Sequence, residues 1–559
     1  MDAEQHTTLL SLFTDRVSKD RDRPAIHTKH EGEFRCKSWS ELANDVGRTA
    51  TGLKSLGVGV GDRVIQVSEN RYEWVVCDFA IQFAEAIHVP VHAPLMGPQI
   101  AYQINDSDAR VVLLSDQDQA AKLASCEKSW NPDTQFVSFE PYEQLSKELP
   151  IRQLASILNE IDDGSISEIM QQGLNNVTPD SLATILYTSG TTGEPKGVML
   201  SHSNLVSNTL TTLEAFRQFD DDLRLSFLPY SHIFARTCDV YTWLATGCEL
   251  AIAESRDTVL ADCAAVKPTV LNGVPYFFDK VRRYLVDEGL ADQEGSLRDL
   301  LGGRMRFCCS GGAALPGHVF DFWNDRGVPI LQGYGLTETS PVITASTETR
   351  NRRGCVGPSI RDVELTIADD GEILTRGPHV MVGYYKNQAA TDEIIQDGWF
   401  HTGDLGELEA DGMLRITGRK KEIIVTALGK NVAPVYLETL LTEDPLIIQA
   451  LVIGDGQNYL TALIVPDPDN LKTAIKARKI RVLSREAALK HPDVLALYEE
   501  TIRNRLKDVS HHEQVRKFTL MNRGFTIESG ELTPKLSLRR NIIQANCAEI
   551  IEAMYHKSS

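Results

Sequence analysis

The sequence has no run of about 18 uninterrupted apolar residues, the least that a membrane-spanning helix needs, and its first residues lack the apolar region of a secretory signal peptide. It also lacks an excess of positive charge, because 57 lysines and arginines stand against 77 aspartates and glutamates, for a net charge of −20. That balance argues against a partner that is mainly phosphate backbone, so we expect no nucleic-acid partner. The ten cysteines form no Cys-x-x-Cys pair and have no zinc-ligand spacing. This pattern is typical of reduced thiols, so we expect a cytoplasmic location.

The length indicates several domains. At roughly 150 residues per domain, the 559 residues predict three or four units, and a hydrophobic content of 42% allows large buried cores. Through the first three quarters of the chain, short apolar runs alternate with helical patterns. This alternation predicts an α/β fold of doubly wound parallel sheets, with ligands at the carboxyl ends of the strands. The expected strands cover residues 63–67, 86–91, 110–114, 183–187, 223–228, 249–253, 268–271, 305–309 and 329–332, and the expected helices cover residues 40–56, 73–84, 203–216, 276–288 and 316–326.

The last third of the chain has a different pattern. Short strands joined by Gly/Asp turns predict a small β-rich subdomain over residues 359–417. After Gly418 an α+β unit begins, with apolar runs of strand length and a long helical stretch toward the C-terminus. We therefore predict a large N-terminal domain, residues 1–417, and a smaller C-terminal domain, residues 418–559.

The sharpest local motif is the segment YTSGTTGEPKG, which begins at Tyr187 directly after an apolar run. A strand that ends in serines, threonines and glycines presents backbone N–H groups and hydroxyls to an anion, and Lys196 adds a positive charge. The segment is not a Walker A loop, because Pro195 stands where that motif has glycine. Taken alone, it could also be a flexible Ser/Gly turn.

Five further motifs follow in order. They are LPYSHIF at 228–234, SGGAAL at 310–315, GYGLTE at 333–338, HTGD at 401–404 and GRKKE at 418–422. Together with the first segment they resemble the adenylate-forming superfamily, which includes acyl-CoA synthetases, peptide-synthetase adenylation domains and firefly luciferases. The likeness covers roughly residues 25–540, and the strings LPYSHIFAR, GYGLTETSP and GKNVAP are most similar to long-chain fatty acyl-CoA synthetases.

The resemblance implies a nucleotide site. Tyr334 would stack on adenine, Thr337 would hydrogen-bond the α-phosphate, and Asp404, assisted by Arg419, would accept hydrogen bonds from the ribose. The residues expected to bind the β- and γ-phosphates are Thr188, Ser189, Gly190, Thr191, Thr192, Gly193 and Lys196, with Gly312 and Gly335 completing the site.

The resemblance also implies a metal ligand, an acyl contact and a hinge. Glu338 would hold Mg²⁺, with Thr188 as a second oxygen ligand. His232 would lie beside the carboxylate of the acyl substrate, although a lone histidine in an apolar stretch is often a core residue. Lys421 matches the hinge about which the C-terminal domain rotates.

The C-terminal segment departs from the family pattern. Family members have a lysine three residues before a basic pair, and this chain has Ser537 there, with Lys535 two positions earlier. Two residues of extended chain span about 6–7 Å and face the same way, so Lys535 could still reach the α-phosphate. The alternative is that Lys535 is a solvated lysine and that this protein adenylates poorly. We expect the catalytic set to be Lys196, Thr337, Glu338 and Lys535.

The function implied is ATP-dependent conversion of a medium- or long-chain fatty acid to acyl-AMP, followed by transfer to CoA. The partners are therefore the fatty acid, ATP and CoA, with Mg²⁺ as cofactor. Two alternatives stay open at this point: a ligase that makes acyl-AMP or loads an acyl carrier protein, and a catalytically weakened regulatory protein that binds nucleotide. Peripheral contact with the inner face of a membrane is compatible with a lipid substrate.

Overall fold

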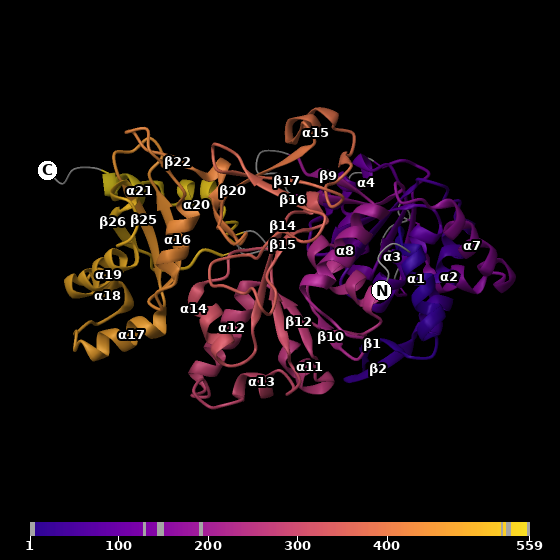
Figure 1. Cartoon of the computed structure of the whole chain (residues 1–559), viewed down its shortest axis with the longest axis horizontal. Helices are drawn as coiled ribbons and strands as arrows, with labels where there is room; N and C mark the ends of the chain where they lie inside the picture. The colour runs from indigo at the N-terminus through magenta and orange to yellow at the C-terminus, as the bar shows by residue number, and fades with distance from the viewer. Residues whose placement is uncertain are drawn as a thin grey trace.

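The computed structural model describes residues 6–126, 130–141, 150–188, 194–526, 529–532 and 538–555. Two eight-stranded sheets form the first part of the chain, and helices cover them (Figure 1). The first sheet has the order β18 (Gly383–Tyr384), β9 (Lys196–Ser201), β8 (Leu182–Thr188), β4 (Ile87–His92), β3 (Arg63–Ser68), β5 (Ala109–Leu114), β6 (Gln135–Ser138) and β7 (Ile151–Gln153). The second has the order β15 (Val342–Ala345), β14 (Ile330–Gly335), β13 (Phe307–Ser310), β12 (Val270–Gly273), β10 (Leu223–Ser226), β11 (Glu249–Ile252), β1 (Pro24–His30) and β2 (Glu33–Ser38).

The predicted doubly wound α/β architecture is confirmed, and the nine expected strands all form within a few residues of their predicted bounds. The sheets are parallel in their centres, but β2, β9, β15 and β18 pair antiparallel at the edges. A short turn joins β1 to β2, and a short turn permits only an antiparallel return. Strands β8 and β9 also pair antiparallel. The sequence analysis did not predict the β1–β2 hairpin, because β2 has no buried residue and neither strand carries an apolar run of strand length.

Helices between the sheets form the largest core cluster. The rings of Trp39 and Trp243 stack in it with centroids 4.5 Å apart, and both side chains are fully buried. This stacked pair packs α2 (Trp39–Ser55) against α10 (Thr242–Thr246), two helices that lie far apart in the sequence. The helices of this core are α1 (Leu9–Asp20), α2, α3 (Tyr72–Phe83), α7 (Ile166–Asn176), α8 (His202–Ala215) and α10, and those packed on the second sheet include α11 (Val259–Val266), α12 (Pro275–Asp287), α13 (Ser296–Leu300) and α14 (Gly317–Asp325).

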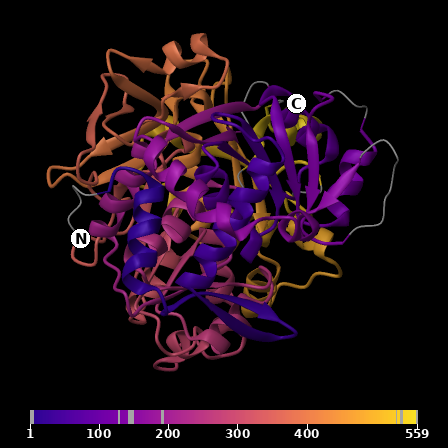
Figure 2. The same cartoon turned by 90° about the vertical axis from the view of Figure 1, so that its right-hand side faces the viewer.

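A separate five-stranded antiparallel sheet follows in the chain. In Figure 2 its orange strands stand at the upper left, apart from the indigo and purple N-terminal elements. Helix α15 (Gln388–Ile394) lies beside it in the chain, and the C-terminal end of β21 leads directly into the last unit. The strands are β16 (Glu364–Ile367), β17 (Glu372–Arg376), β19 (Ile395–Gln396), β20 (Trp399–Leu408) and β21 (Leu414–Arg419).

The C-terminal unit is a three-stranded sheet with helices packed on it, and it lies at one end of the molecule (Figure 1). Its own core cluster contains Leu437, Ala462 and Tyr498. Among the described residues, no helix is long and apolar enough to cross a bilayer. The elements are β22 (Ile424–Val425), β23 (Asn431–Val432), α16 (Pro434–Thr442), β24 (Ile447–Ile453), β25 (Leu460–Pro466), α17 (Pro468–Ala477), α18 (Arg485–Leu489), α19 (Pro492–Arg505), β26 (Val515–Leu520), α20 (Arg540–Asn546) and α21 (Ala548–Tyr555).

Candidate active site

The Ser/Thr/Gly segment connects two neighbouring strands. Thr188 ends β8 and Lys196 begins β9, and the two residues lie opposite each other in the ladder. The Thr188 hydroxyl is 3.5 Å from the Lys196 carbonyl oxygen. The loop therefore starts and ends at one edge of the sheet, with a hydroxyl and an ammonium group at its base. The predicted phosphate-binding residues Ser189, Gly190, Thr191, Thr192 and Gly193 lie outside the described residues.

Tyr384 connects this loop to the predicted metal ligand. Its hydroxyl donates a hydrogen bond of 2.8 Å to Oε1 of Glu338, and Nζ of Lys196 lies 4.9 Å from the centre of its ring. Burial and the Glu338 carboxylate raise the pKa of Tyr384, so the phenol stays protonated and continues to donate. The structure thus brings Lys196 and Glu338 to the same aromatic side chain.

The sequence analysis missed Tyr384. It lies far along the chain from both partners and reaches them only because β18 pairs with β9, with Tyr384 opposite Val198. A second contact fixes the same geometry, since the backbone N–H of Met381 donates to the carbonyl oxygen of Glu338 over 2.8 Å. A two-residue strand carries no apolar periodicity that a sequence could reveal.

A second group of predicted residues meets at Asp404. The Tyr334 hydroxyl donates to Oδ2 of Asp404 over 2.7 Å, and Nε of Arg419 lies 2.9 Å from Oδ1. Asp404 and Arg419 are also paired in the ladder between β20 and β21. Burial raises the pKa of Asp404 while the Arg419 charge opposes that shift, and the Glu338 charge adds to the rise. The two groups of the site are therefore close enough to interact electrostatically.

Gly335 and Gly312 have different structural reasons for lacking a side chain. A Cβ at Gly335 would lie 1.6 Å from the Pro341 carbonyl oxygen, so the chain before Thr337 can fold back only with glycine there. Gly312 has φ +79°, a left-handed conformation that favours glycine, and a Cβ there would meet no atom within 4 Å. Open space beside a backbone is what close approach by a ligand requires. Thr337 itself begins a short 3-10 turn, Thr337–Thr339, that carries Glu338.

His232 follows β10 of the second sheet and directly precedes the short helix α9 (Ile233–Ala235). Its ring lies against that of His92, with centroids 4.8 Å apart, and Nδ1 of His92 is 3.3 Å from the Ser231 hydroxyl. The neighbouring Phe234 packs against Gly311, where a Cβ would come within 3.1 Å of its ring. The histidine pair is therefore held next to the glycine loop after β13, and His92 is a residue that sequence reasoning missed.

A fully buried network of charged and polar side chains contacts β8 through Thr184. Arg236 forms an ion pair with Asp78, and its Nη1 donates to the Thr184 hydroxyl over 2.7 Å. Asp78 also receives a hydrogen bond of 2.8 Å from the His88 ring. Burial opposes the charge on Asp78, but Arg236 and His88 outweigh it and lower the pKa of that carboxyl. A satisfied network of this kind fixes the strand that ends at Thr188.

The predicted hinge, Lys421, lies between two anchors. On one side of it, Nζ of Lys420 is 2.6 Å from Asp370 and 2.9 Å from Glu372 in the five-stranded sheet. On the other side, Glu422 is 3.5 Å from Nε of Arg540 in the C-terminal unit. Lys421 itself is exposed. Lys535, the predicted catalytic lysine, lies outside the described residues.

The described residues contain no group of three or more His, Cys, Asp or Glu side chains that could hold a metal ion. Mg²⁺ is commonly held by only one or two carboxylates together with phosphate oxygens of a bound nucleotide. Glu338 offers a carboxylate bonded to the same tyrosine that Lys196 contacts, and Thr188 offers a hydroxyl. These hard oxygen donors fit Mg²⁺ on a nucleotide rather than an all-protein metal cage.

Comparison with known proteins decides the family. A family described as AMP-binding enzyme matches residues 13–385, and one described as AMP-binding enzyme C-terminal domain matches residues 421–559. The chain belongs to the AMP-binding enzyme family. The predicted membership in the adenylate-forming superfamily is thereby confirmed. The first match contains Thr188, Lys196, Glu338 and Tyr384, and the second begins at Lys421.

Other members of this AMP-binding family align along nearly the whole chain. The long-chain-fatty-acid–CoA ligase FadD15 of Mycobacterium bovis is 34% identical and covers 99% of this chain and 98% of its own length. The peroxisomal long chain acyl-CoA synthetase 6 of Arabidopsis thaliana is 29% identical and covers 98% of this chain and 86% of its own length.

Solved structures show the same fold. The anthranilate CoA ligase AuaEII in complex with anthranoyl-AMP superposes with a TM-score of 0.80 at 19% identity, over 99% of this chain and 100% of that chain. ATP-bound MatB from Rhodopseudomonas palustris superposes with a TM-score of 0.73 at 24% identity, over 97% of this chain and 99% of that chain. The sheets and the C-terminal unit described above therefore have the same fold as these two structures.

Proposed function

We propose that this protein is an ATP-dependent ligase that converts a medium- or long-chain fatty acid to its acyl-CoA, with release of AMP and pyrophosphate. The observation that carries this proposal is the alignment of the whole chain with proteins named long-chain-fatty-acid–CoA ligases, at up to 34% identity. The contacts of Lys196 and Glu338 with Tyr384, and of Asp404 with Tyr334 and Arg419, support it, because they gather the cation and the carboxylates that binding of ATP and Mg²⁺ would use.

The first step converts the fatty-acid carboxylate, a poor acyl donor, into acyl-AMP, a good one. A carboxylate oxygen of the fatty acid attacks the α-phosphorus of ATP, the bond to the bridging oxygen breaks, and pyrophosphate leaves. Lys196 and the Ser/Thr/Gly loop bind the leaving phosphates, and Thr337 donates a hydrogen bond to the α-phosphate. Mg²⁺, held by Glu338 and Thr188, supplies charge neutralisation when bound. Such positioning and neutralisation are the main contributions a protein makes to phosphoryl chemistry.

Three residues hold the nucleoside. Asp404 accepts hydrogen bonds from the ribose hydroxyls, and its contacts with Tyr334 and Arg419 fix its orientation beforehand. Those contacts leave further lone pairs on the carboxylate oxygens. The ring of Tyr334 offers its face to adenine, and His232 lies beside the fatty-acid carboxylate.

The second step uses the same site after a domain rotation. The CoA thiol attacks the acyl carbonyl of acyl-AMP and AMP leaves. We propose residues 1–417 and 418–559 as the two domains, with rotation about Lys421. The fixed contacts of Lys420 and Glu422 on either side support a hinge confined to this residue. Lys535 would contact the α-phosphate only in the adenylating orientation.

An acid panel from acetate to oleate tests this function, with pyrophosphate exchange reporting adenylation and AMP release with CoA reporting the complete reaction. We expect both signals with palmitate and oleate. Exchange without CoA-dependent AMP release would favour a carrier-protein ligase, and nucleotide binding without exchange would favour a regulatory protein. A tenfold preference in kcat/KM for acetate over palmitate, about 1.4 kcal/mol, would contradict the proposed chain length.

A further inference from the structure

The C-terminal unit carries a concentration of positive charge in an otherwise acidic chain. Residues 471–491 contain seven lysines and arginines and one glutamate, whereas the chain as a whole has a net charge of −20. This segment, which we call the basic face, comprises most of α17, the loop after it and α18. All seven cationic side chains are exposed. In Figure 1, α17 and α18 lie at the outer lower corner of the molecule, away from the two large sheets.

Most of these cations lack an acidic partner. Arg478 is paired, because its Nη2 lies 3.6 Å from Oε2 of Glu500 on α19. The nearby Asp467 is already used, since its carboxylate accepts hydrogen bonds from two backbone N–H groups at the start of α17. Neighbouring like charges repel each other, so an external anionic surface would relieve that repulsion. The cations that form no ion pair with another described residue are Lys472, Lys476, Lys479, Arg481, Arg485 and Lys490.

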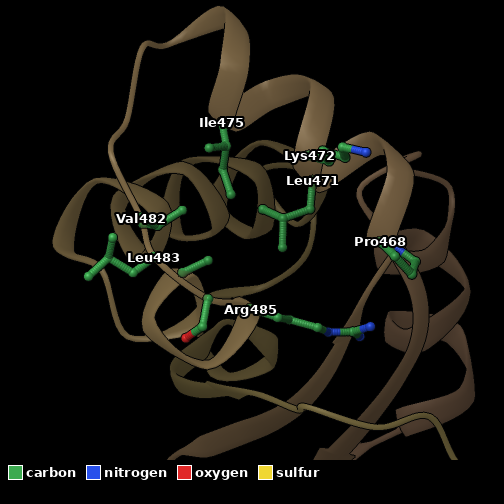
Figure 3. Close-up of a pocket in the computed structure, with 9 residues that line it drawn as sticks. Pro468, Leu471, Lys472, Ile475, Val482, Leu483 and Arg485 are labelled. Atoms are coloured by element: carbon green, nitrogen blue, oxygen red, sulfur yellow. The ribbon is translucent and has the colours of Figure 1, made fainter.

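An exposed apolar side chain stands among these charges. Leu483 is 103% exposed, so it extends from the loop without touching the protein surface. Beside it lies a hollow of about 330 Å³, and Figure 3 shows Leu471, Ile475 and Val482 directed toward it, with Lys472 and Arg485 nearby. A protruding aliphatic side chain in a basic segment is typical of proteins that rest on a membrane surface, where the aliphatic group enters the acyl boundary and the cations remain among the headgroups.

We propose that the basic face docks this protein on an anionic lipid bilayer, with Leu483 inserted at the interface and the six unpaired cations against lipid phosphates. A fluid bilayer accepts a protruding leucine anywhere on its surface, whereas an acidic protein would need a matching pocket for it. This docking does not depend on the proposed ligase reaction, so vesicle binding is measured without substrates.

Cosedimentation of the full-length protein with vesicles tests the proposal. We expect binding to phosphatidylcholine vesicles that contain about one third phosphatidylglycerol, no binding to phosphatidylcholine alone, and weaker binding at high salt. Each cation near an anionic surface contributes about fivefold to binding, so the double variant Lys479→Glu, Arg481→Glu should bind at least 25-fold more weakly. Leu483→Asp should lower binding about tenfold, because a buried leucine side chain is replaced by a charge.

Matched variants elsewhere on the surface serve as controls. Lys280→Glu with Arg304→Glu makes the same change of charge at exposed positions of the second sheet's helices and loops, and Val60→Asp replaces another exposed aliphatic residue. These variants should bind anionic vesicles as the wild type does, and all variants should unfold at the wild-type temperature. Equal binding to both kinds of vesicle, or full binding by the Lys479→Glu, Arg481→Glu variant, would overturn the proposal. The proposal would also be overturned if the Lys479→Glu, Arg481→Glu variant lost binding while Leu483→Asp bound as the wild type does, because the basic face would then recognise polyanions in general.

Discussion

A single tyrosine links the two charged residues expected to act on the phosphates. Tyr384 donates to Glu338, and its ring lies below Lys196, so it holds a carboxylate and an ammonium group near each other without a direct ion pair. Asp404 is fixed in a similar way by Tyr334 and Arg419. At the scale of residues, the carboxylates of Glu338 and Asp404 are therefore each held in position by a tyrosine hydroxyl.

Removal of the Tyr384 hydroxyl should weaken metal-dependent adenylation. A hydrogen bond to a charged group contributes about 1.5–3 kcal/mol, so Tyr384→Phe should lower the rate of pyrophosphate exchange about tenfold or more and raise the Mg²⁺ concentration for half-maximal rate. The adjacent Tyr385→Phe is the control, because Tyr385 contacts the phosphate-loop strand through its backbone N–H. An unchanged Mg²⁺ dependence in Tyr384→Phe would show that Glu338 needs no positioning by this residue.

At the scale of elements, the return of the chain after β14 places Thr337 and Glu338. The backbone N–H of Leu336 donates to the Pro341 carbonyl oxygen over 3.1 Å, and this tight return leaves no room for a side chain at Gly335. The Asp78–Arg236 network similarly holds β8 so that Thr188 meets Lys196. Both sets of contacts hold loops at the carboxyl ends of strands, where ligands are expected in folds of this kind.

Gly335→Ala tests whether the tight return of the chain after β14 shapes the site. Its Cβ would lie 1.6 Å from backbone oxygen, so the turn must move and nucleotide binding should fall at least about tenfold, with a lower unfolding temperature. Gly333→Ala, two residues earlier in the same strand, is the matched control because its Cβ would lie 3.6 Å from the nearest atom. ATP binding measured by calorimetry should therefore separate the two variants. Equal affinity in both would mean that the return after β14 does not shape the site.

At the scale of the whole molecule, the C-terminal unit is joined to the rest through Lys421 and also through Arg353, whose Nη2 is 2.9 Å from Glu443. On either side of this proposed hinge the ion pairs differ: Lys420 pairs with acids of the five-stranded sheet, and Glu422 pairs with Arg540 of the C-terminal unit. Such a junction suits one site used in two orientations.

Lys535→Ala should affect the two half reactions differently. If its ammonium group meets the α-phosphate only in the adenylating orientation, acyl-AMP formation should fall by about 10²-fold or more, while transfer of supplied acyl-AMP to CoA changes little. Pyrophosphate exchange and single-turnover thioester formation measure these steps separately, and Ser537→Ala is the control. A wild-type rate of adenylation in Lys535→Ala would assign the task to another cation, and an equal loss in both steps would indicate damage to the domain instead.

Two buried histidines should make global stability depend on pH. Burial, reinforced by Arg236, lowers the pKa of His88 to about 4, and burial lowers that of His202 to about 3. In the unfolded chain these values return to about 6.5. As the pH falls below about 6.5, these histidines therefore become protonated in the unfolded state but stay neutral in the folded state, so the free energy of unfolding decreases. At pH 5 the loss is about 2 kcal/mol for each histidine.

Denaturant unfolding at pH 7 and pH 5 measures this effect. His202→Gln should show a smaller difference between the two conditions, because glutamine does not titrate and its carbonyl oxygen can replace Nδ1 as the acceptor of the Leu9 N–H group. His30→Gln, at an exposed position, should retain the full difference. A wild-type stability that is the same at both values would contradict the assignment of neutral buried histidines.

The sequence by itself determined the family, the α/β architecture and the composition of the phosphate loop. Strands such as β3 and helices such as α2 carry apolar runs or periodicities within a few residues, and the loop from Tyr187 to Lys196 is contiguous, so local chemistry is enough to predict them. The tertiary structure alone decided the antiparallel edges, the contacts of Tyr384 and the buried partners of Arg236. These depend on which distant strands pair and on which polar groups are enclosed together. The exposure of Leu483 among unpaired cations belongs with them, because a sequence records charge and apolarity but not which side chains the fold leaves in solvent.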